Sequence, residues 1–136
     1  MVKIHIDYEG NLRCRLTHAP SGNQITTDAP VDNMGKGEAF SPTDLAAAAL
    51  GSCMLTVMGI AARKISVELS GATADIEKEM IPAPIRRIGK ISVIITMPQG
   101  IPISHRKTLE EAGRNCPVRK SLGPDVETPV RFIYPD

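Results

Sequence analysis

Two cysteines far apart in this 136-residue chain are the residues whose type and setting could do chemistry. Cys53 lies inside the longest apolar run of the sequence, and Cys116 stands directly before Pro117. A thiol within a central helix and a second thiol at a helix start suit a peroxidatic and resolving couple, in which a sulfenic acid formed on one sulfur is captured by the other. The alternative is that Cys53 is a small buried hydrophobic residue and Cys116 a packing residue.

The two thiols differ in what could stabilise a negative charge on them. Cys53 lies about three turns into its helix, where the helix dipole is weak, so a nucleophilic Cys53 needs an imported cation or hydrogen-bond donor. Cys116 is predicted at the N-cap of a short helix that has Pro117 just inside its start and Gly123 just beyond its end. Free backbone N–H groups there, with Arg119 and Lys120 nearby, could favour a thiolate.

The remaining cysteine and the histidines do not form a catalytic or metal-binding cluster in the sequence. Cys14 alternates with Arg13 and Arg15 on a predicted strand and is interpreted as a core residue. An odd number of cysteines with no close pair argues against a disulfide framework, and reduced thiols are typical of the cytoplasm. No metal site is expected, because no histidines stand at ligand spacing, the three being His5, His18 and His105.

The run around Cys53 is predicted to form the central helix of the fold, residues 41–64. Ser41 can cap its start, Pro42 suits the first helical position, and Asp44 lies at the positive end of the dipole. The residues are apolar on every side, so the helix must be covered all round.

A membrane-spanning helix is the alternative for this run. The uncharged stretch Leu45–Ala62 would span roughly 27 Å at about 1.5 Å per residue, just within transmembrane range. Alanine and glycine dominate it, however, and strand-like sequence surrounds it with no second hydrophobic span. A buried helix in a soluble protein is the better interpretation.

Apolar and polar residues alternate on both sides of this helix, as in β-strands. Three strands and an exposed loop are predicted before it: 1–7, 12–17, 24–27 and 32–38. Two strands, a helix capped by Ser104, a short helix capped by Cys116 and a last strand are predicted after it: 72–77, 91–97, 104 to about 113, 116–123 and 126–134. Pro129 places the last strand at a sheet edge or bulge.

This order predicts a single α+β domain, residues 1–136, with a three-strand part (1–40), the central helix (41–64) and a C-terminal part (65–136). One sheet covers only one side of the central helix. A second copy of the chain is the simplest cover for the other side, so an intertwined homodimer is predicted.

The composition excludes several classes of partner. Sixteen Lys and Arg against fifteen Asp and Glu leave a net charge of +1, which provides no field to attract nucleic acid or an anionic membrane. Two Tyr, two Phe and no Trp are a poor set of platforms for stacking bases. The start, 1–7, alternates like a strand and has no apolar signal region, so a cytoplasmic protein is expected.

The segment Ser41-Pro42-Thr43-Asp44-Leu45 through Cys53, with the later Cys116-Pro117-Val118, resembles the OsmC/Ohr family of osmotically induced and organic hydroperoxide resistance proteins. The similarity spans nearly the whole chain. It implies an OsmC-like α+β fold, with antiparallel sheets around a long buried helix, and a swapped homodimer with each active site at the subunit interface.

The resemblance also implies an activity, the thiol-dependent reduction of small organic hydroperoxides. Cys53 matches the peroxidatic position and Cys116 the resolving one. The disulfide between them is reopened by an external dithiol, and neither a metal nor a cofactor is required.

The chain departs from the family pattern at the charged pair that holds the thiolate. Family peroxidases typically have a glutamate after the proline of the helix signature, where this chain has Thr43; Asp44 or Glu38 could substitute. The expected arginine is also absent from its place, and Arg13 and Arg15 are the candidates earlier on the strand, with Arg15 assigned the possible thiolate-stabilising role. Two other functions are therefore kept open: a non-catalytic dimer that binds a small hydrophobic ligand, and a thiol redox sensor.

Overall fold

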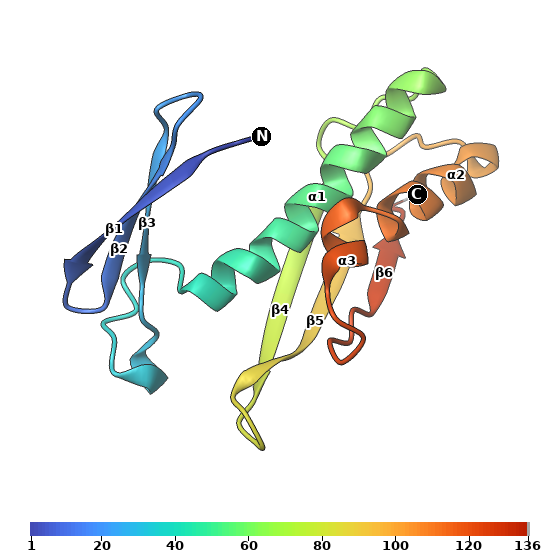
Figure 1. Ribbon diagram of the computed structural model, residues 1–136. Coiled ribbons are helices and arrows are strands. Elements are labelled where there is room, and N and C mark those ends of the chain that lie inside the picture. The colour runs from blue at the N-terminus through green and yellow to red at the C-terminus, as the bar shows by residue number, and fades with distance from the viewer. Residues whose placement is uncertain (136) are drawn as a thin grey trace. The chain divides into compact units, whose positions relative to one another are not determined.

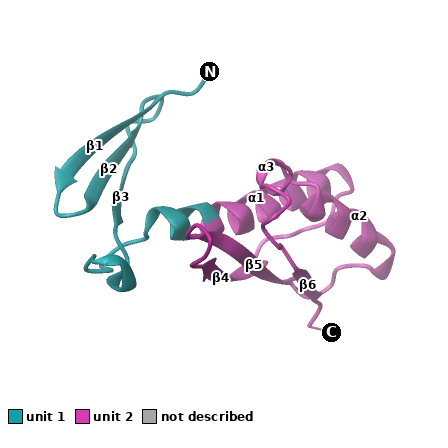
Figure 2. Ribbon diagram, turned by 60° about the horizontal axis from the view of Figure 1, so that its bottom comes forward, with its two compact units in different colours: residues 1–46 teal, residues 47–136 magenta. Residues whose placement is uncertain are grey.

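The computed structural model describes residues 1–135 (Figure 1). Its elements are, in order, β1 (Ile4–Gly10), β2 (Arg13–His18), β3 (Gln24–Asp28), the 3-10 helix η1 (Val31–Asn33), α1 (Pro42–Lys64), β4 (Thr73–Ile81), β5 (Arg87–Thr96), α2 (Ile103–Arg114), α3 (Pro117–Ser121) and β6 (Val130–Ile133). The chain falls into two compact units, 1–46 and 47–136 (Figure 2). Each unit is described by itself.

The first unit is built on an antiparallel sheet in the order β1-β2-β3. Its register pairs Ile6 with Leu16 and Leu16 with Ile25, so the apolar residues of the three strands share one face. Most of this face is uncovered, because Ile4, Ile6 and Ile25 are 62%, 55% and 47% exposed. The alternation predicted from the sequence is therefore correct, but the unit does not bury the face that the alternation creates.

The start of α1 is fixed by a reciprocal pair of hydrogen bonds. The Asp44 N–H donates to Ser41 Oγ at 3.0 Å, and the Ser41 N–H donates to Asp44 Oδ2 at 3.0 Å. Pro42 occupies the first helical position, where its missing N–H is not needed. The predicted cap is confirmed, and α1 ends at Lys64 as predicted.

The second unit contains a sheet in the order β4-β5-β6. β4 and β5 are antiparallel, whereas β5 and β6 are parallel, a difference from the antiparallel sheets that were expected. The reason is the connection: α2 and α3 lie between β5 and β6 in the chain and provide the long crossover that parallel strands need. β6 is an edge strand, as Pro129 predicted.

Two predicted boundaries are wrong in this unit. α2 begins at Ile103 with Pro102 as its N-cap and no side-chain cap, so Ser104 lies inside the helix instead of capping it. The last strand begins at Val130 and not at position 126. The preceding segment forms a turn, in which the Val126 N–H donates to the Gly123 carbonyl at 3.1 Å, and joins β5 only by an isolated bridge at Glu127.

One stripe of α1 forms the core of the second unit. The buried residues of the helix recur at helical spacing and are Ala47, Leu50, Gly51, Met54, Met58 and Ala62. They pack in one cluster with Ile91, Val93 and Ile95 of β5. α2 approaches closely at Gly113, where an added Cβ would lie 2.9 Å from Met58 Sδ.

Within the second unit, the opposite side of α1 is left open at Ile60, which is 53% exposed. The elements of this unit therefore do not cover the helix all round. Among residues 1–135, α1 is the one helix long and apolar enough to cross a membrane, a test that the core helix of a soluble protein also passes. Its stripe of buried residues is that of a core helix.

Candidate active site

Cys116 is the N-cap of α3, as the sequence predicted. Its backbone is extended, Pro117 follows at the first helical position, and its Sγ accepts a hydrogen bond from the Arg119 N–H at 3.4 Å. The residue is fully buried, with 0% of its surface exposed. The cap places the Cys116 sulfur in the core of the second unit.

Cys53 is the neighbour of this sulfur. The Cys53 and Cys116 side chains are close enough for Cys53 to act on the ionisation of the Cys116 thiol, and both residues are free cysteines without a disulfide. Cys53 lies on α1 beside the buried stripe and is half-buried. Two thiols that are far apart in the sequence are therefore partners in the fold, and the more accessible of them is Cys53.

The ionisation of Cys116 differs from the expectation. Burial raises the pKa of the Cys116 thiol, the Arg119 backbone N–H acts in the opposite direction, and the hydrogen bond and charge of Cys53 raise it further. The prediction of a favoured thiolate at Cys116 is wrong, because desolvation outweighs the helix-cap N–H. A neutral Cys116 thiol can instead donate its proton in a hydrogen bond to the Cys53 sulfur.

The Arg119 side chain does not supply the missing charge. Its guanidinium donates to Thr128 Oγ1 at 3.0 Å, to the Thr128 carbonyl at 3.3 Å and to the Arg114 carbonyl at 2.9 Å. The three acceptors are neutral oxygens on neighbouring segments. Sequence reasoning named Arg119 only for its charge and missed these contacts, because they depend on the fold.

The candidate residue Glu38 belongs to a charged cluster in the first unit. Arg13 lies 3.2 Å from Asp28 Oδ2 and 3.7 Å from Glu38 Oε2, and Asp28 is buried, with 1% exposed. The Glu38 N–H donates to Asp28 at 3.0 Å and is the main cause that holds the pKa of this carboxyl below its ordinary value, with Arg13 contributing. Asp28 was missed as a candidate, although its pairing with Arg13 across β2 and β3 is the signal that could have found it.

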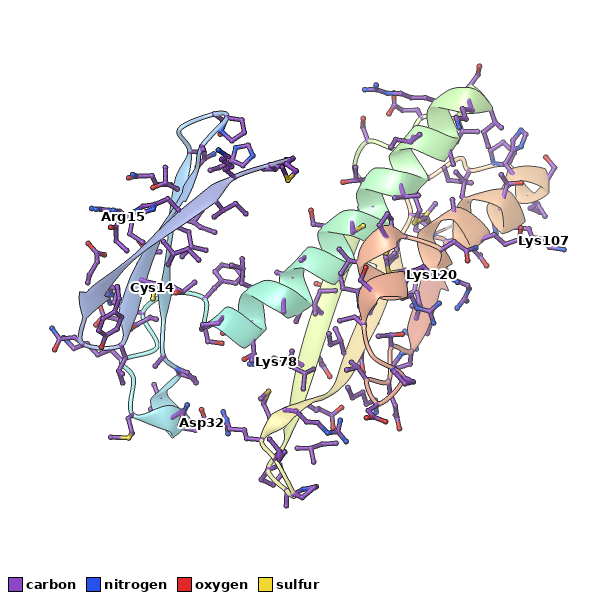
Figure 3. The ribbon with its side chains drawn as sticks, viewed as in Figure 1. Cys14, Arg15, Asp32, Lys78, Lys107 and Lys120 are labelled. Atoms are coloured by element: carbon purple, nitrogen blue, oxygen red, sulfur yellow. The ribbon has the colours of Figure 1, made fainter. Side chains whose placement is uncertain are left out.

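Arg15 lies on the polar face of the first sheet, opposite the face that carries Cys14 (Figure 3). Its guanidinium is 3.4 Å from Asp7 Oδ2 and 3.5 Å from Glu9 Oε2, so two carboxylates hold it. Cys14 is half-buried and not a core residue of the unit. The role of Arg15 as a partner of a thiolate stays a prediction.

Thr43 and Asp44 both belong to the capped start of α1. The Thr43 hydroxyl lies 3.2 Å from Ser41 Oγ, and Asp44 forms the reciprocal bonds of the cap. These contacts give both residues a structural role. Residues 1–135 contain no group of three or more His, Cys, Asp and Glu side chains that could hold a metal ion.

The comparisons with known proteins assign the chain to a family. The family model described as OsmC-like protein matches residues 35–130. This range includes α1, both site cysteines and the strands between them, so the chain belongs to the OsmC-like family, and the resemblance inferred from its motifs is confirmed.

Solved structures of the same family share the fold. A protein of Psychrobacter arcticus 273-4, provisionally assigned to the osmotic stress and detoxification response, is 44% identical, with 97% of this chain and 96% of that chain covered and a TM-score of 0.91. The organic hydroperoxide resistance protein OsmC of Legionella pneumophila is 14% identical, with 98% and 96% covered and a TM-score of 0.75.

OhrB, the organic hydroperoxide resistance protein of Bacillus subtilis, is 14% identical, with 97% of both chains covered and a TM-score of 0.69. At 14% identity, these last two structures show that the fold is shared and nothing more. No curated protein matches the chain. The α+β, OsmC-like fold class is thus established.

Proposed function

We propose that this protein is a cysteine-based peroxidase that reduces organic hydroperoxides, with Cys53 as the peroxidatic residue and Cys116 as the resolving residue. The observation that carries the proposal is the proximity of the Cys53 and Cys116 side chains, which interact although the two residues are far apart in the sequence. Cys53 is half-buried and can be reached by a small molecule, whereas Cys116 is fully buried and keeps its proton. This difference assigns the two roles.

In the first step, the Cys53 thiolate attacks the outer oxygen of the hydroperoxide. A sulfur–oxygen bond forms, the peroxide O–O bond breaks, and the alkoxide takes up a proton and leaves as an alcohol. Sulfur is oxidised to sulfenic acid and the peroxide is reduced. The neutral Cys116 thiol donates a hydrogen bond to the attacking sulfur, which is the donor that the position of Cys53 within α1 requires.

In the second step, the Cys116 sulfur attacks the sulfenic acid. The sulfur–sulfur bond forms, the S–OH bond breaks, and hydroxide leaves with the Cys116 proton as water. An external dithiol then reduces the disulfide by exchange and returns both thiols. This cycle suits a reducing cytoplasm, where such dithiols are maintained.

The surroundings of Cys53 favour an organic hydroperoxide over hydrogen peroxide. One turn away from it on α1 lie two apolar residues that are not fully buried, Ala49, which is exposed, and Val57, which is partly buried. An alkyl or aryl group can be desolvated against such a surface, which hydrogen peroxide cannot exploit.

Stopped-flow mixing with cumene or tert-butyl hydroperoxide tests the cycle. The native protein should lose one thiol pair per peroxide and form the Cys53–Cys116 disulfide. Cys116→Ser should stop at a Cys53 sulfenic acid that dimedone traps, and Cys14→Ser, the matched control, should react like the native protein. A Cys53→Ser protein that still reduces the peroxide would overturn the proposal.

The protein is further proposed to act as an intertwined homodimer. The apolar face of the first sheet, which includes Ile4, Ile6 and Ile25, is exposed, and one side of α1 is uncovered near Ile60. Burial of such surfaces by a second copy is favourable at about 25 cal/mol per Å². The N-terminal sheet of each chain would then have the cover that its own unit lacks.

A non-catalytic dimer that binds a hydrophobic ligand is the alternative that one observation favours. A cavity of about 570 Å³ lies in the second unit between α1 and the segment after it, lined by Leu55, Ile60, Val67 and Leu69 among others, and neither Cys53 nor Cys116 lines it. If this is the function, an apolar fluorescent probe should bind equally well to the native protein and to the variant Cys53→Ser, and peroxide should not oxidise the native thiols.

A further inference from the structure

Arg119 connects the segments on which the position of Cys116 depends. α3 has five residues and is too short to be stable by itself, so contacts with its surroundings fix it. The Arg119 backbone N–H donates to Cys116 Sγ at 3.4 Å, and its side chain returns to the Arg114 carbonyl at 2.9 Å. The chain from Arg114 to Arg119 is thereby closed into a loop that contains Cys116.

The same guanidinium links this loop to the sheet. It donates to Thr128 Oγ1 at 3.0 Å and to the Thr128 carbonyl at 3.3 Å, just before β6. β6 pairs with β5, and β5 packs against the stripe of α1 that lies beside Cys53. Arg119 therefore links the loop that contains Cys116 to the sheet that packs against α1, the helix that carries Cys53.

We infer that Arg119 is a positioning residue for the Cys53–Cys116 pair: its hydrogen bonds to Arg114 and Thr128 hold α3 where the two sulfurs can join. Disulfide closure demands such positioning, because two neighbouring sulfurs must approach to about 2.05 Å with a defined torsion. The guanidinium of Arg119 is bonded to three neutral oxygens, and the contact of this residue with the Cys116 sulfur is made by its backbone N–H. The consequence for catalysis, faster resolution of the sulfenic acid, rests on the proposed function.

The first experiment measures the effective concentration of the two thiols, which does not require peroxidase activity. The full-length native protein and each variant are equilibrated with reduced and oxidised glutathione, and the fraction of Cys53–Cys116 disulfide is measured after acid quenching. Arg119→Met keeps an unbranched apolar stem and removes the donors, and it should lower the effective concentration by about tenfold or more. Arg119→Lys, which keeps one donor group, should recover part of the loss.

Two variants serve as comparisons. Lys120 is the exposed neighbour of Arg119 on α3 (Figure 3), so Lys120→Met, the matched control, should stay within about twofold of the native value. Thr128→Val removes the Oγ1 acceptor alone and should have a smaller effect than Arg119→Met. If Arg119→Met does not fold, as judged by circular dichroism, Thr128→Val and Arg119→Lys carry the test.

The second experiment separates this inference from the proposed function. With cumene hydroperoxide, Arg119→Met should form the Cys53 sulfenic acid at the native rate, close the disulfide about tenfold more slowly and accumulate sulfinic acid. If the native protein forms no sulfenic acid but its glutathione equilibrium depends on Arg119, the peroxidase proposal fails and the positioning role stands. An Arg119→Met protein with native effective concentration overturns the positioning role, whatever the peroxide does.

Discussion

At Cys116, two influences on the ionisation of one residue act in opposite directions. The Arg119 N–H at the helix cap stabilises a thiolate, whereas complete burial destabilises it, and burial raises the pKa of the thiol on balance. A neutral thiol is a weak nucleophile, so an attack by Cys116 requires a strongly electrophilic partner such as a sulfenic acid on Cys53. A buried thiol with a raised pKa is compatible with the resolving role proposed for Cys116.

Alkylation tests this description of the two thiols. Iodoacetamide at about pH 8 should modify Cys53 faster than Cys116, by about tenfold or more, because Cys116 is both inaccessible and neutral. Mass spectrometry of tryptic peptides over time gives the two rates. In denaturant they should become equal, and equal rates in the native protein would contradict the assignment.

Asp28 is the corresponding case in the first unit, a buried carboxylate whose charge is retained. The Glu38 N–H and the Arg13 guanidinium lower the pKa of this carboxyl. Because the pKa of this carboxyl is lower in the folded protein than in the unfolded chain, the ionised Asp28 stabilises the fold above the unfolded pKa of about 3.9. This stabilisation is lost as the pH falls through the folded-state pKa.

The variant Asp28→Asn should therefore be less stable than the native protein at pH 7, by a few degrees in Tm, because it leaves Arg13 and the Glu38 N–H without their anionic acceptor. The difference should shrink below pH 4. Thermal unfolding between pH 3 and 7 measures it, with Asp75→Asn, which removes an exposed carboxylate on β4, as a control for surface charge. A difference that persists unchanged at pH 3 would exclude the carboxylate as its source.

At the scale of elements, the central helix depends on its first turn. Ser41 is 1% exposed and shares reciprocal hydrogen bonds with Asp44. These bonds satisfy donors that a helix start otherwise leaves unpaired. The direction and first residue of α1 are thus set by a motif of four neighbouring residues.

Ser41→Ala should lower the free energy of unfolding by about 1 kcal/mol, within the usual range of about 0.5 to 2 kcal/mol for a lost N-cap. Chemical denaturation monitored by circular dichroism measures the change. Thr56→Ala in the same helix is the matched control, because this exposed hydroxyl bonds only to the Ser52 carbonyl within the helix and its loss should stay within about 0.5 kcal/mol. Equal effects of the two variants would show that the cap is not important.

At the scale of the whole molecule, the uncovered apolar face of the first sheet is the dominant feature. Ile4, Ile6 and Tyr8 on β1 are more than half exposed, whereas the second unit has a well-buried core. An exposed face of this kind is typical of a surface that pairs with another protein chain. The proposed homodimer provides that chain.

Light scattering at micromolar concentration should give twice the mass of the 14.6 kDa chain. Ile6→Arg places a charge on the apolar face and should produce monomers or unfolded protein, because a dimer would bury that charge without a partner. His5→Arg, which lies on the polar face of the same strand and is exposed, should remain dimeric. A monomeric native protein would contradict the proposal.

Interactions between near neighbours could be read from the sequence, and they are correct in the structure. The Ser41–Asp44 cap, the Cys116-Pro117 start of α3 and the alternation of β1 and β2 all depend on residues a few positions apart. The prediction that Ser104 caps a helix is wrong, although it rests on the same local reasoning. A serine suits a cap, but α2 already begins at Ile103. The residue type makes a helix cap possible, whereas the position at which the helix begins depends on how the segment packs in the fold.

The sequence by itself determined the two reactive residue types, the helix that carries Cys53 and, through its motifs, the OsmC-like family. Only the tertiary structure decided that the Cys53 and Cys116 side chains lie close together, that burial raises the pKa of the Cys116 thiol and that the Arg119 side chain bonds to Arg114 and Thr128. The physical reason is range: helix capping acts over a few residues, whereas desolvation and contact depend on every segment that packs around an atom.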